Sequence, residues 1–383
     1  MNFSLRYAVK FAVAPAMLAM IVGCGQGDGS KELEQGKAAY EVRDLVKAGK
    51  MFEKCVKLAP ENVDALVYLA RVKLDLGNLD EAKSSIVKAE GLASGDTDIT
   101  LLRAQLAWHE KDYAVAAQAY SEIAANVRLT AEERAQGFAG LGVVEMTCEH
   151  HHLARIAFMR AIRLDRKNAS AWYHLGLLYR DCFDYPESAL EQFDIFVRLE
   201  ASASPRVQKV QRTIIPALKE KISRAATDRP GVAKRNSASA ASAIAKAEAA
   251  WKKGAFKAAR DAYQEAVKAD PLSYPAALGL AKAWEKTDAT KAGMAKAYDN
   301  YKIACTLRPS AISTFLAAGA LAAKLGYFAQ AVEIYSRAMA ASPTSLEAID
   351  GMIRSLRRSG NRQQVAEAYQ GYRDSLSVRK KKK

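Results

Sequence analysis

A pattern of small and aromatic residues recurs along this chain about every 34 residues. In each occurrence a small residue precedes a large apolar residue by four positions, and a third apolar or small residue follows three positions later. The occurrences are Ala48/Phe52/Cys55, Ala82/Ile86/Ala89, Ala116/Tyr120/Ile123, Ala154/Phe158/Ala161, Ala189/Phe193/Phe196, Ala259/Tyr263/Ala266, Ala297/Tyr301/Ala304, Ala331/Tyr335/Ala338 and Val365/Tyr369/Tyr372. Their first members are separated by 34, 34, 38, 35, 70, 38, 34 and 34 residues. Such a period predicts stacked copies of one supersecondary unit.

The unit itself is predicted to be helical. The spacing within each occurrence is that of one helix face, and prolines follow where a helix should end, at Pro60, Pro271, Pro309 and Pro343. Alanine and leucine abound, and no stretch alternates apolar and polar residues as a half-buried strand would. The sequence therefore predicts an all-α fold.

Residues 171–193 carry a more specific pattern. Trp172, Leu175, Gly176 and Tyr179 have the spacing W-x2-L-G-x2-Y, and A-x3-F follows at Ala189. This segment resembles the tetratricopeptide repeat, a 34-residue helix-turn-helix unit. The resemblance covers about residues 29–203 and 240–379. It implies an α-solenoid of about nine repeats in two arrays, each curving into a right-handed superhelix with a concave groove.

The N-terminus carries a different signal. An apolar stretch from Phe11 to Val22 follows Arg6 and Lys10, and it is too short to span a bilayer as a helix. Ile21-Val22-Gly23-Cys24 resembles the lipobox of bacterial lipoproteins, which implies cleavage before Cys24 and acylation of that cysteine. An ordinary signal peptide with a chance cysteine, or a short membrane anchor, is the alternative. In this class an aspartate after the cysteine marks the inner membrane, so Gly25 favours the periplasmic side of the outer membrane.

The 70-residue step divides the arrays. Ser204-Pro205 resembles a helix start, the following apolar face predicts a helix with a kink at Pro216, and residues 224–242 read as a linker. The predicted organisation is a signal peptide (1–23), a lipidated cysteine and spacer (24–30), five repeats (31–203), a capping helix and basic linker (204–239), four repeats (240–378) and a basic tail (379–383).

The net charge of +15 is concentrated in two places. Residues 206–235 have a net charge of +7 and residues 354–383 a net charge of +8. These charges are either simply solvated or contact an anionic polysaccharide or lipid, the latter through Arg379, Lys380, Lys381, Lys382 and Lys383. Nucleic acid is disfavoured, because an exported lipoprotein rarely meets it and no stacking aromatics interleave with the charge.

No catalytic motif stands out, and we expect neither an enzyme nor a cofactor. Cys148 and His150–His152 form the one cluster that resembles a metal or catalytic site. The side chains of consecutive histidines on a turn point in different directions, so we predict no metal site. Cys55 and Cys305 read as packing residues, and a disulfide between Cys148 and Cys182 is improbable because equivalent positions of stacked repeats lie far apart.

The groove is the favoured binding site. In the family, fixed positions of the first helix of each repeat line it. In this chain those positions hold Leu101, Gln105, Trp108, Ala139, Val143, Met146, Tyr173, Leu177 and Arg180. They would form an apolar strip that suits a peptide or a partner helix, unless some pack under a neighbouring helix.

The predicted function is therefore that of a membrane-tethered scaffold for protein–protein interactions in the bacterial cell envelope. It would help to assemble a pilus, a secretion machine or an outer-membrane complex. The alternative is a structural tether that contacts anionic polysaccharide or lipid through the basic segments.

Overall fold

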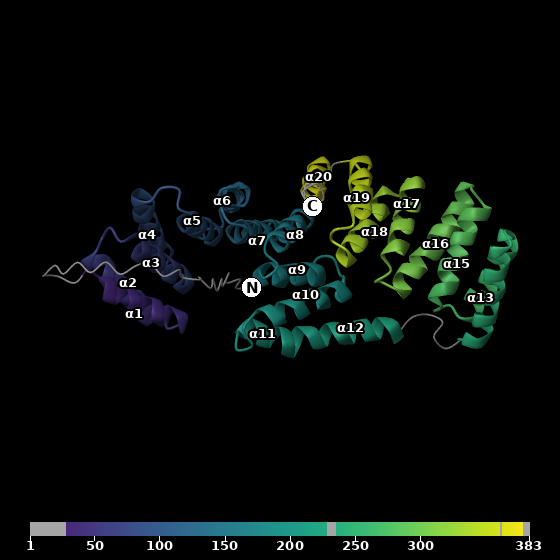
Figure 1. Ribbon diagram of the computed structural model, residues 1–383, viewed down its shortest axis with the longest axis horizontal. Helices are drawn as coiled ribbons and strands as arrows, with labels where there is room; N and C mark the ends of the chain where they lie inside the picture. Colours follow the sequence, from purple (N-terminus) through teal and green to yellow (C-terminus); the bar gives the residue numbers. More distant parts are fainter. Residues whose placement is uncertain (1–27, 228–234, 361, 378–383) are drawn as a thin grey trace. The chain divides into compact units, whose positions relative to one another are not determined.

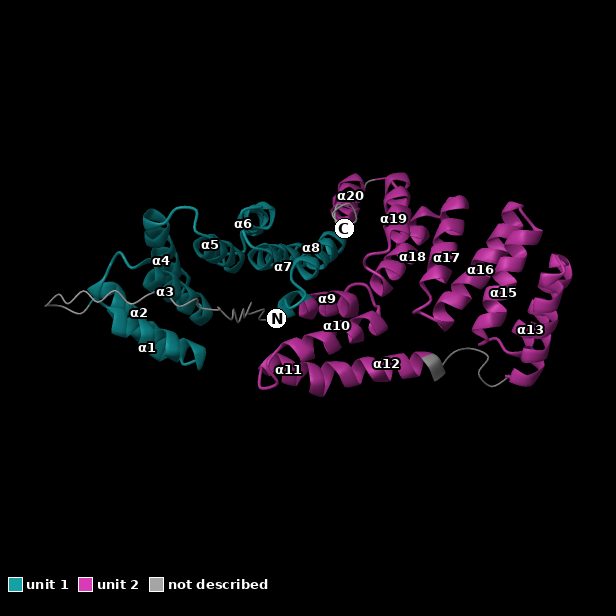
Figure 2. Cartoon of the chain, viewed as in Figure 1, with its two compact units in different colours: residues 1–171 teal, residues 172–383 magenta. Residues whose placement is uncertain are grey.

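The computed structural model describes residues 28–227, 235–360 and 362–377, and within these ranges it contains helices and turns but no strand (Figure 1). The chain divides into two compact units, Met1–Ala171 and Trp172–Lys383 (Figure 2). This boundary falls inside residues 31–203, which the sequence assigns to one array of five repeats.

Unit 1 is a run of consecutive helices. They are α1 (Ser30–Glu41), α2 (Leu45–Leu58), α3 (Val63–Leu76), α4 (Leu79–Leu92), α5 (Thr97–His109), α6 (Tyr113–Ala125), α7 (Ala131–Thr147) and α8 (His151–Leu164). The helix α7 is 17 residues long and begins with a capping box, in which the side chains of Thr130 and Glu133 each accept a hydrogen bond from the other residue's backbone N–H.

Unit 2 begins within α9 and has a longer connection in its middle. Its helices are α9 (Ala169–Asp181), α10 (Pro186–Leu199), α11 (Pro205–Lys209), α12 (Ile215–Thr227), α13 (Ser237–Lys252), α14 (Phe256–Ala269), α15 (Tyr274–Thr287), α16 (Lys291–Leu307), α17 (Ile312–Lys324), α18 (Phe328–Ala341), α19 (Leu346–Arg358) and α20 (Gln363–Ser377).

The helices form nine consecutive pairs within the described residues, as the repeat count predicts. The small first member of the first eight occurrences is fully buried, and the large residue four positions later is at most 8% exposed. The ninth occurrence is out of phase. Val365 is only half-buried, and its neighbour Ala366 occupies the fully buried position, so the expectation for Val365 is wrong by one residue.

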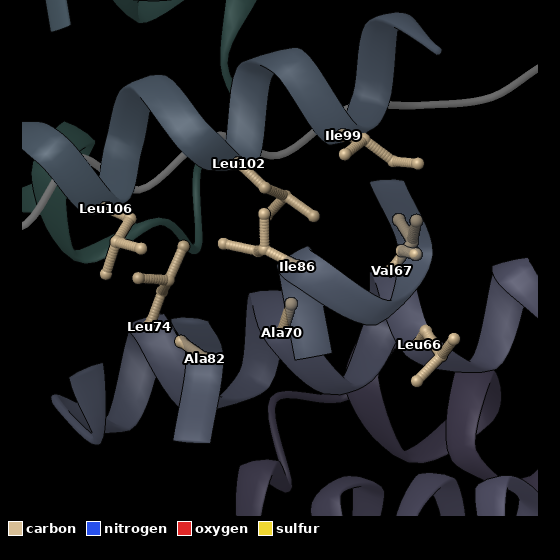
Figure 3. Close-up of a cluster of buried hydrophobic side chains, with 10 residues drawn as sticks. Leu66, Val67, Ala70, Leu74, Ala82, Ile86, Ile99, Leu102 and Leu106 are labelled. Atoms are coloured by element: carbon tan, nitrogen blue, oxygen red, sulfur yellow. The ribbon is translucent and has the colours of Figure 1, made fainter. Parts of the chain in front are cut away.

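Each core extends beyond its own pair. Figure 3 shows Leu74 of α3, Ile86 of α4 and Leu102 of α5 pointing into one cluster, which therefore joins one pair to the first helix of the next. All three side chains are at most 5% exposed. One pair alone would leave this face in water, which is why the repeats must stack.

The connection between the two runs of pairs is helical for longer than the sequence suggests. A π-helical turn, Val210–Ile214, joins α11 to α12 immediately before Pro216. Proline has no N–H and clashes with the carbonyl four residues earlier, and the wider turn accommodates this. The predicted linker is too long, because α12 continues to Thr227 and α13 already begins at Ser237.

Several predictions concern residues outside the described ranges. They are the signal peptide, the lipidated Cys24, and the basic tail from Arg379 to Lys383. Among the described residues, no helix combines the length and the apolar character that crossing a bilayer requires.

Candidate functional site

Several first helices of successive pairs contact one another directly, in addition to their contacts with the second helices. These contacts join α1 to α3, α3 to α5, α5 to α7, α13 to α15 and α17 to α19. The repeats are therefore closest together along their first helices. We call these helices the inner row: α1, α3, α5 and α7 in unit 1, and α13, α15, α17 and α19 in unit 2.

At the third pair the residues predicted to form the apolar strip are only partly exposed. Leu101, Gln105 and Trp108 of α5 are all half-buried. Leu101 and Trp108 pack against the core formed with α6 and α7, and the Trp108 indole N–H is buried with no acceptor among the described residues. Their side chains therefore contribute mainly to packing.

For the fourth pair the prediction is wrong at two of three positions. Ala139 and Val143 of α7 are 0% and 2% exposed, so no partner can reach them, whereas Met146 is half-buried. The same helix is rich in glycine and packs very closely on its neighbours. A Cβ added to Gly140 would lie 2.2 Å from Tyr120 Cε1, and one added to Gly137 would lie 2.7 Å from the Ala124 nitrogen. Without these side chains α6 packs very closely on α7.

At the fifth pair the predicted strip is also largely covered. Leu177 is only 8% exposed, so the prediction that it lines an open groove is wrong. The Tyr173 ring packs on Phe196 at 5.0 Å between centroids, and the guanidinium of Arg206 in α11 lies 5.6 Å from the Tyr173 ring. Arg180 forms an ion pair with Asp181 at 2.5 Å. The segment that follows the fifth pair thus lies over part of this face.

The cysteine and histidine residues of the α7–α8 turn do not converge. His150 Nδ1 lies 2.8 Å from Glu145 Oε2, and no group of three or more potential ligands that could hold a metal ion occurs within the described part of the chain. Burial raises the pKa of Cys148, with a further contribution from the Glu145 carboxylate. Burial also raises the pKa of Cys305 to about 12. Both thiols are thus poorly suited to act as nucleophiles.

A pocket opens on the inner row of unit 2, between α13 and α15. It has a volume of about 230 Å³ and is lined by Glu248, Trp251, Lys252, Tyr263, Gly279 and Lys282. The Trp251 ring packs edge-on against Phe256, with 5.0 Å between centroids, and so has a fixed orientation. The Tyr263 ring reaches the pocket from α14 because Gly279 has no side chain to block it.

The rim of this pocket is charged. Glu248, Lys252 and Lys282 are exposed, and none of them forms an ion pair with another described residue. The pKa of Tyr263 is raised by burial and by the nearby Glu248 carboxylate, so the phenol stays neutral at ordinary pH. The aromatic residues of the pocket can bind a side chain of a partner. The two lysine ammonium groups at the rim can pair with an acidic residue beside that side chain.

Two segments of the chain match family models described as "Tetratricopeptide repeat", residues 39–106 and residues 244–309. Both segments therefore contain tetratricopeptide repeats. Repeats of this family serve as scaffolds for protein–protein interaction and are typically not catalytic. All the residues that line the pocket lie within the second matched segment.

Comparison with curated protein sequences gave no match. Among solved structures, the chain is similar to PilF of Pseudomonas aeruginosa, with 17% identity over 65% of this chain and 95% of that one and a TM-score of 0.39. A tetratricopeptide-repeat protein of Thermus thermophilus has 17% identity over 50% of this chain and 99% of that one, with a TM-score of 0.43.

YrrB, described as having an unusual peptide-binding site, is 16% identical over 50% of this chain and 92% of that one, with a TM-score of 0.34. At such identities and TM-scores, none of these likenesses indicates what this protein binds.

Two pocket residues occupy repeat positions that the sequence analysis assigned to the groove, but they belong to a different repeat. Trp251 precedes Ala259 by eight residues, as Trp108 precedes Ala116, and Glu248 corresponds in the same way to Gln105. Carrying these positions into the second array would have identified Glu248 and Trp251. The openness of the pocket could not be found in that way, because it depends on Gly279 of the following repeat.

Proposed function

We propose that this protein is a lipid-anchored scaffold of the bacterial cell envelope, and that the inner row of its second array holds a segment of a partner protein. The observation that supports partner binding is the open pocket between α13 and α15, which has a fixed aromatic floor and a charged rim. The partner complex would be one that assembles in the envelope, such as a pilus, a secretion machine or an outer-membrane complex.

The tether would work through proximity. The described residues begin at Asp28, four residues after Cys24. Even a fully extended chain spans at most about 3.6 Å per residue, so the start of α1 at Ser30, six residues after Cys24, would stay within about 22 Å of the anchored cysteine. Several acyl chains on Cys24 would make the attachment lasting. Holding the repeats near a membrane complex raises the effective concentration of each partner, so modest affinity at the pocket suffices.

In-cell photocrosslinking tests this proposal. A photoreactive amino acid replaces Lys252 or Lys282 at the pocket rim, and Lys268 of the second helix α14 serves as the matched exposed control. We expect one dominant protein adduct from the rim positions and none from Lys268. Cys24→Ala should weaken that adduct and move the chain out of the membrane fraction. A chain whose rim positions give no protein adduct is not a scaffold of this kind.

The alternative of a structural envelope tether is favoured by the net charge of +8 in residues 354–383. Deleting residues 379–383 distinguishes the two. If the deletion abolishes envelope association while Cys24 is still acylated, the chain is a tether; if the crosslinked partner and the association are unchanged, the scaffold is supported.

A further inference from the structure

Every first helix of the second array ends with an exposed cation. The four residues are Lys252, Lys286, Lys324 and Arg358, separated by 34, 38 and 34 residues. Each stands in the last turn of its helix, on α13, α15, α17 and α19 in turn. We call these four residues the basic row. Since equivalent positions of stacked repeats line up, the basic row follows one edge of the inner row.

A cation at a helix C-terminus interacts favourably with the helix dipole, and this effect accounts for any one of the four. The helix dipole does not explain why all four first helices of the second array end with such a cation. In unit 1, α1 and α7 have no basic residue in their last turn. Lys73, in the last turn of α3, is buried and lies 2.6 Å from both Glu53 and Glu81. The basic row is different, because none of its members forms an ion pair with another described residue.

Packing against the preceding repeat positions two of the four cations. Lys286 Nζ lies 5.5 Å from the ring centroid of Phe256, and Arg358 Cζ lies 5.8 Å from that of Phe328. In both cases the aromatic residue is the first residue of the preceding second helix. These cation–π contacts leave the charged groups facing solvent while restricting their movement.

Nearby carboxylates are occupied by other partners. Glu285 accepts a hydrogen bond from the Tyr301 hydroxyl at 2.9 Å, and Asp350 forms an ion pair with Arg373. Glu248 is the exposed acid at the pocket, and Lys252 and Lys282 flank it there. The positive charge of this edge is therefore not neutralised by the acids beside it, and it complements an acidic partner.

The pocket lies at one end of the basic row, and Lys252 belongs to both. Its volume of about 230 Å³ is below the roughly 300–1,000 Å³ typical of small-molecule sites. A single large side chain suits that space better than a cofactor does. Trp251 and Tyr263 offer it an aromatic surface, the kind of surface on which anchor residues of interfaces bind.

We propose that the inner row of the second array binds an extended acidic segment of a partner protein. Its carboxylates pair with Lys252, Lys286, Lys324 and Arg358, and one of its apolar side chains enters the pocket. This inference rests on the proposed function, since it names the class of partner that the same face receives.

The experiment measures fluorescence anisotropy of a labelled peptide of glutamates around one central phenylalanine, titrated with the purified full chain. Lys286→Glu/Lys324→Glu should weaken binding about tenfold, because two exposed attractions each become a repulsion. Lys257→Glu/Lys268→Glu changes the net charge equally on α14 and should alter binding less than about twofold. Equal losses in the two double variants would overturn the basic row as the binding site.

The pocket is tested separately, first with the wild-type chain. Replacing the phenylalanine of the peptide by alanine should weaken binding about tenfold, as expected for loss of an anchor side chain. Trp251→Ala should then weaken binding of the phenylalanine peptide but not of the alanine peptide. If both peptides bind the wild-type chain equally, the pocket does not receive an apolar anchor.

Heparin and single-stranded DNA complete the design. Tighter binding of either polyanion than of the acidic peptide, with the same loss in Lys286→Glu/Lys324→Glu, would overturn a protein segment as the ligand. If no acidic peptide binds while the rim positions still crosslink to a protein in cells, the scaffold stands and the acidic partner class is wrong.

Discussion

Gly279 of α15 lies directly against the ring of Tyr263 in α14, so that a Cβ added to Gly279 would be 2.3 Å from Tyr263 Cε1. This distance is far below van der Waals contact, and the two helices can approach this closely only without a side chain at that position. The same relationship between a glycine and a repeat aromatic recurs for Gly36 with Phe52, Gly140 with Tyr120, Gly142 with Phe158, Gly176 with Phe193, and Gly319 and Gly351 with Tyr335.

Gly279→Ala should therefore destabilise the chain by about 1–3 kcal/mol, the usual cost of overpacking a core. The displaced Tyr263 ring should also disturb the pocket, so binding of the phenylalanine-containing peptide should weaken. Urea unfolding followed by circular dichroism measures the first effect, and peptide anisotropy measures the second.

Gly91 provides the matched control. It also lies within a helix, α4, but a Cβ added there would meet nothing within 4 Å. Gly91→Ala should stabilise the chain by about 0.4–1 kcal/mol, because alanine restricts the unfolded chain at no steric cost. If both alanine variants changed stability in the same direction, the close contact at Tyr263 would not be the cause.

The phase of α20 gives a second test. Ala366 is fully buried, whereas Val365 is half-buried. Ala366→Val should cost about 1–3 kcal/mol through overpacking, and Val365→Ala should cost about 1 kcal/mol or less, since few contacts are lost. A larger cost for Val365→Ala than for Ala366→Val in urea unfolding would mean that α20 follows the phase that the sequence pattern predicts.

The sequence predicts the cores of this protein well because each depends on a short, repeated pattern. Ala189 and Phe193, for example, are buried where α10 packs on its own first helix, α9. That packing depends only on the spacing of apolar residues within a short stretch of sequence. The prediction for the ninth repeat is wrong by one residue because its pattern begins with a valine instead of an alanine. The predicted helix register there therefore depends on Tyr369 and Tyr372 alone.

The exposure of the binding positions could not be predicted in the same way. Val143 and Glu248 occupy the same repeat position, eleven residues before Ala154 and Ala259, yet Val143 is buried and Glu248 borders a pocket. What decides between them is the packing of the neighbouring helices: α7 packs very closely on its neighbours, whereas a pocket remains between α13 and α15 beside Glu248 and Trp251. Such closeness is a property of two repeats together, not of one repeat pattern.

The start of the second array is fixed by an ion pair. Arg235 donates two hydrogen bonds to the buried Asp270 carboxylate, at 3.0 and 3.1 Å. Asp270→Asn should cost about 1–2 kcal/mol at pH 7, because bonds to a charged group are lost. Asp261→Asn, at an exposed carboxylate beside Arg260, should change stability by less than about 0.5 kcal/mol. Equal effects in the two variants would contradict a special role for Asp270.

The effect of Asp270→Asn should depend on pH. The hydrogen bonds from Arg235 hold the pKa of Asp270 below its usual range. A carboxyl group with a lowered folded-state pKa stabilises the fold fully above its unfolded-state pKa of about 3.9, and this contribution declines as the pH falls further. The difference in unfolding free energy between the wild-type chain and Asp270→Asn should therefore be constant from pH 5 to 7 and shrink below about pH 4.

Tyr173 distinguishes a packing role from a binding role at the fifth pair. Its ring lies 5.0 Å from Phe196 and 6.0 Å from Phe193, and burial raises its pKa. Tyr173→Ala should thus cost about 2–4 kcal/mol of stability and leave the affinity for the acidic peptide unchanged. Tyr173→Phe keeps the ring and should restore stability. A Tyr173→Ala variant of normal stability that loses its crosslinked partner would instead place the binding face at the fifth pair, where the family positions predicted it.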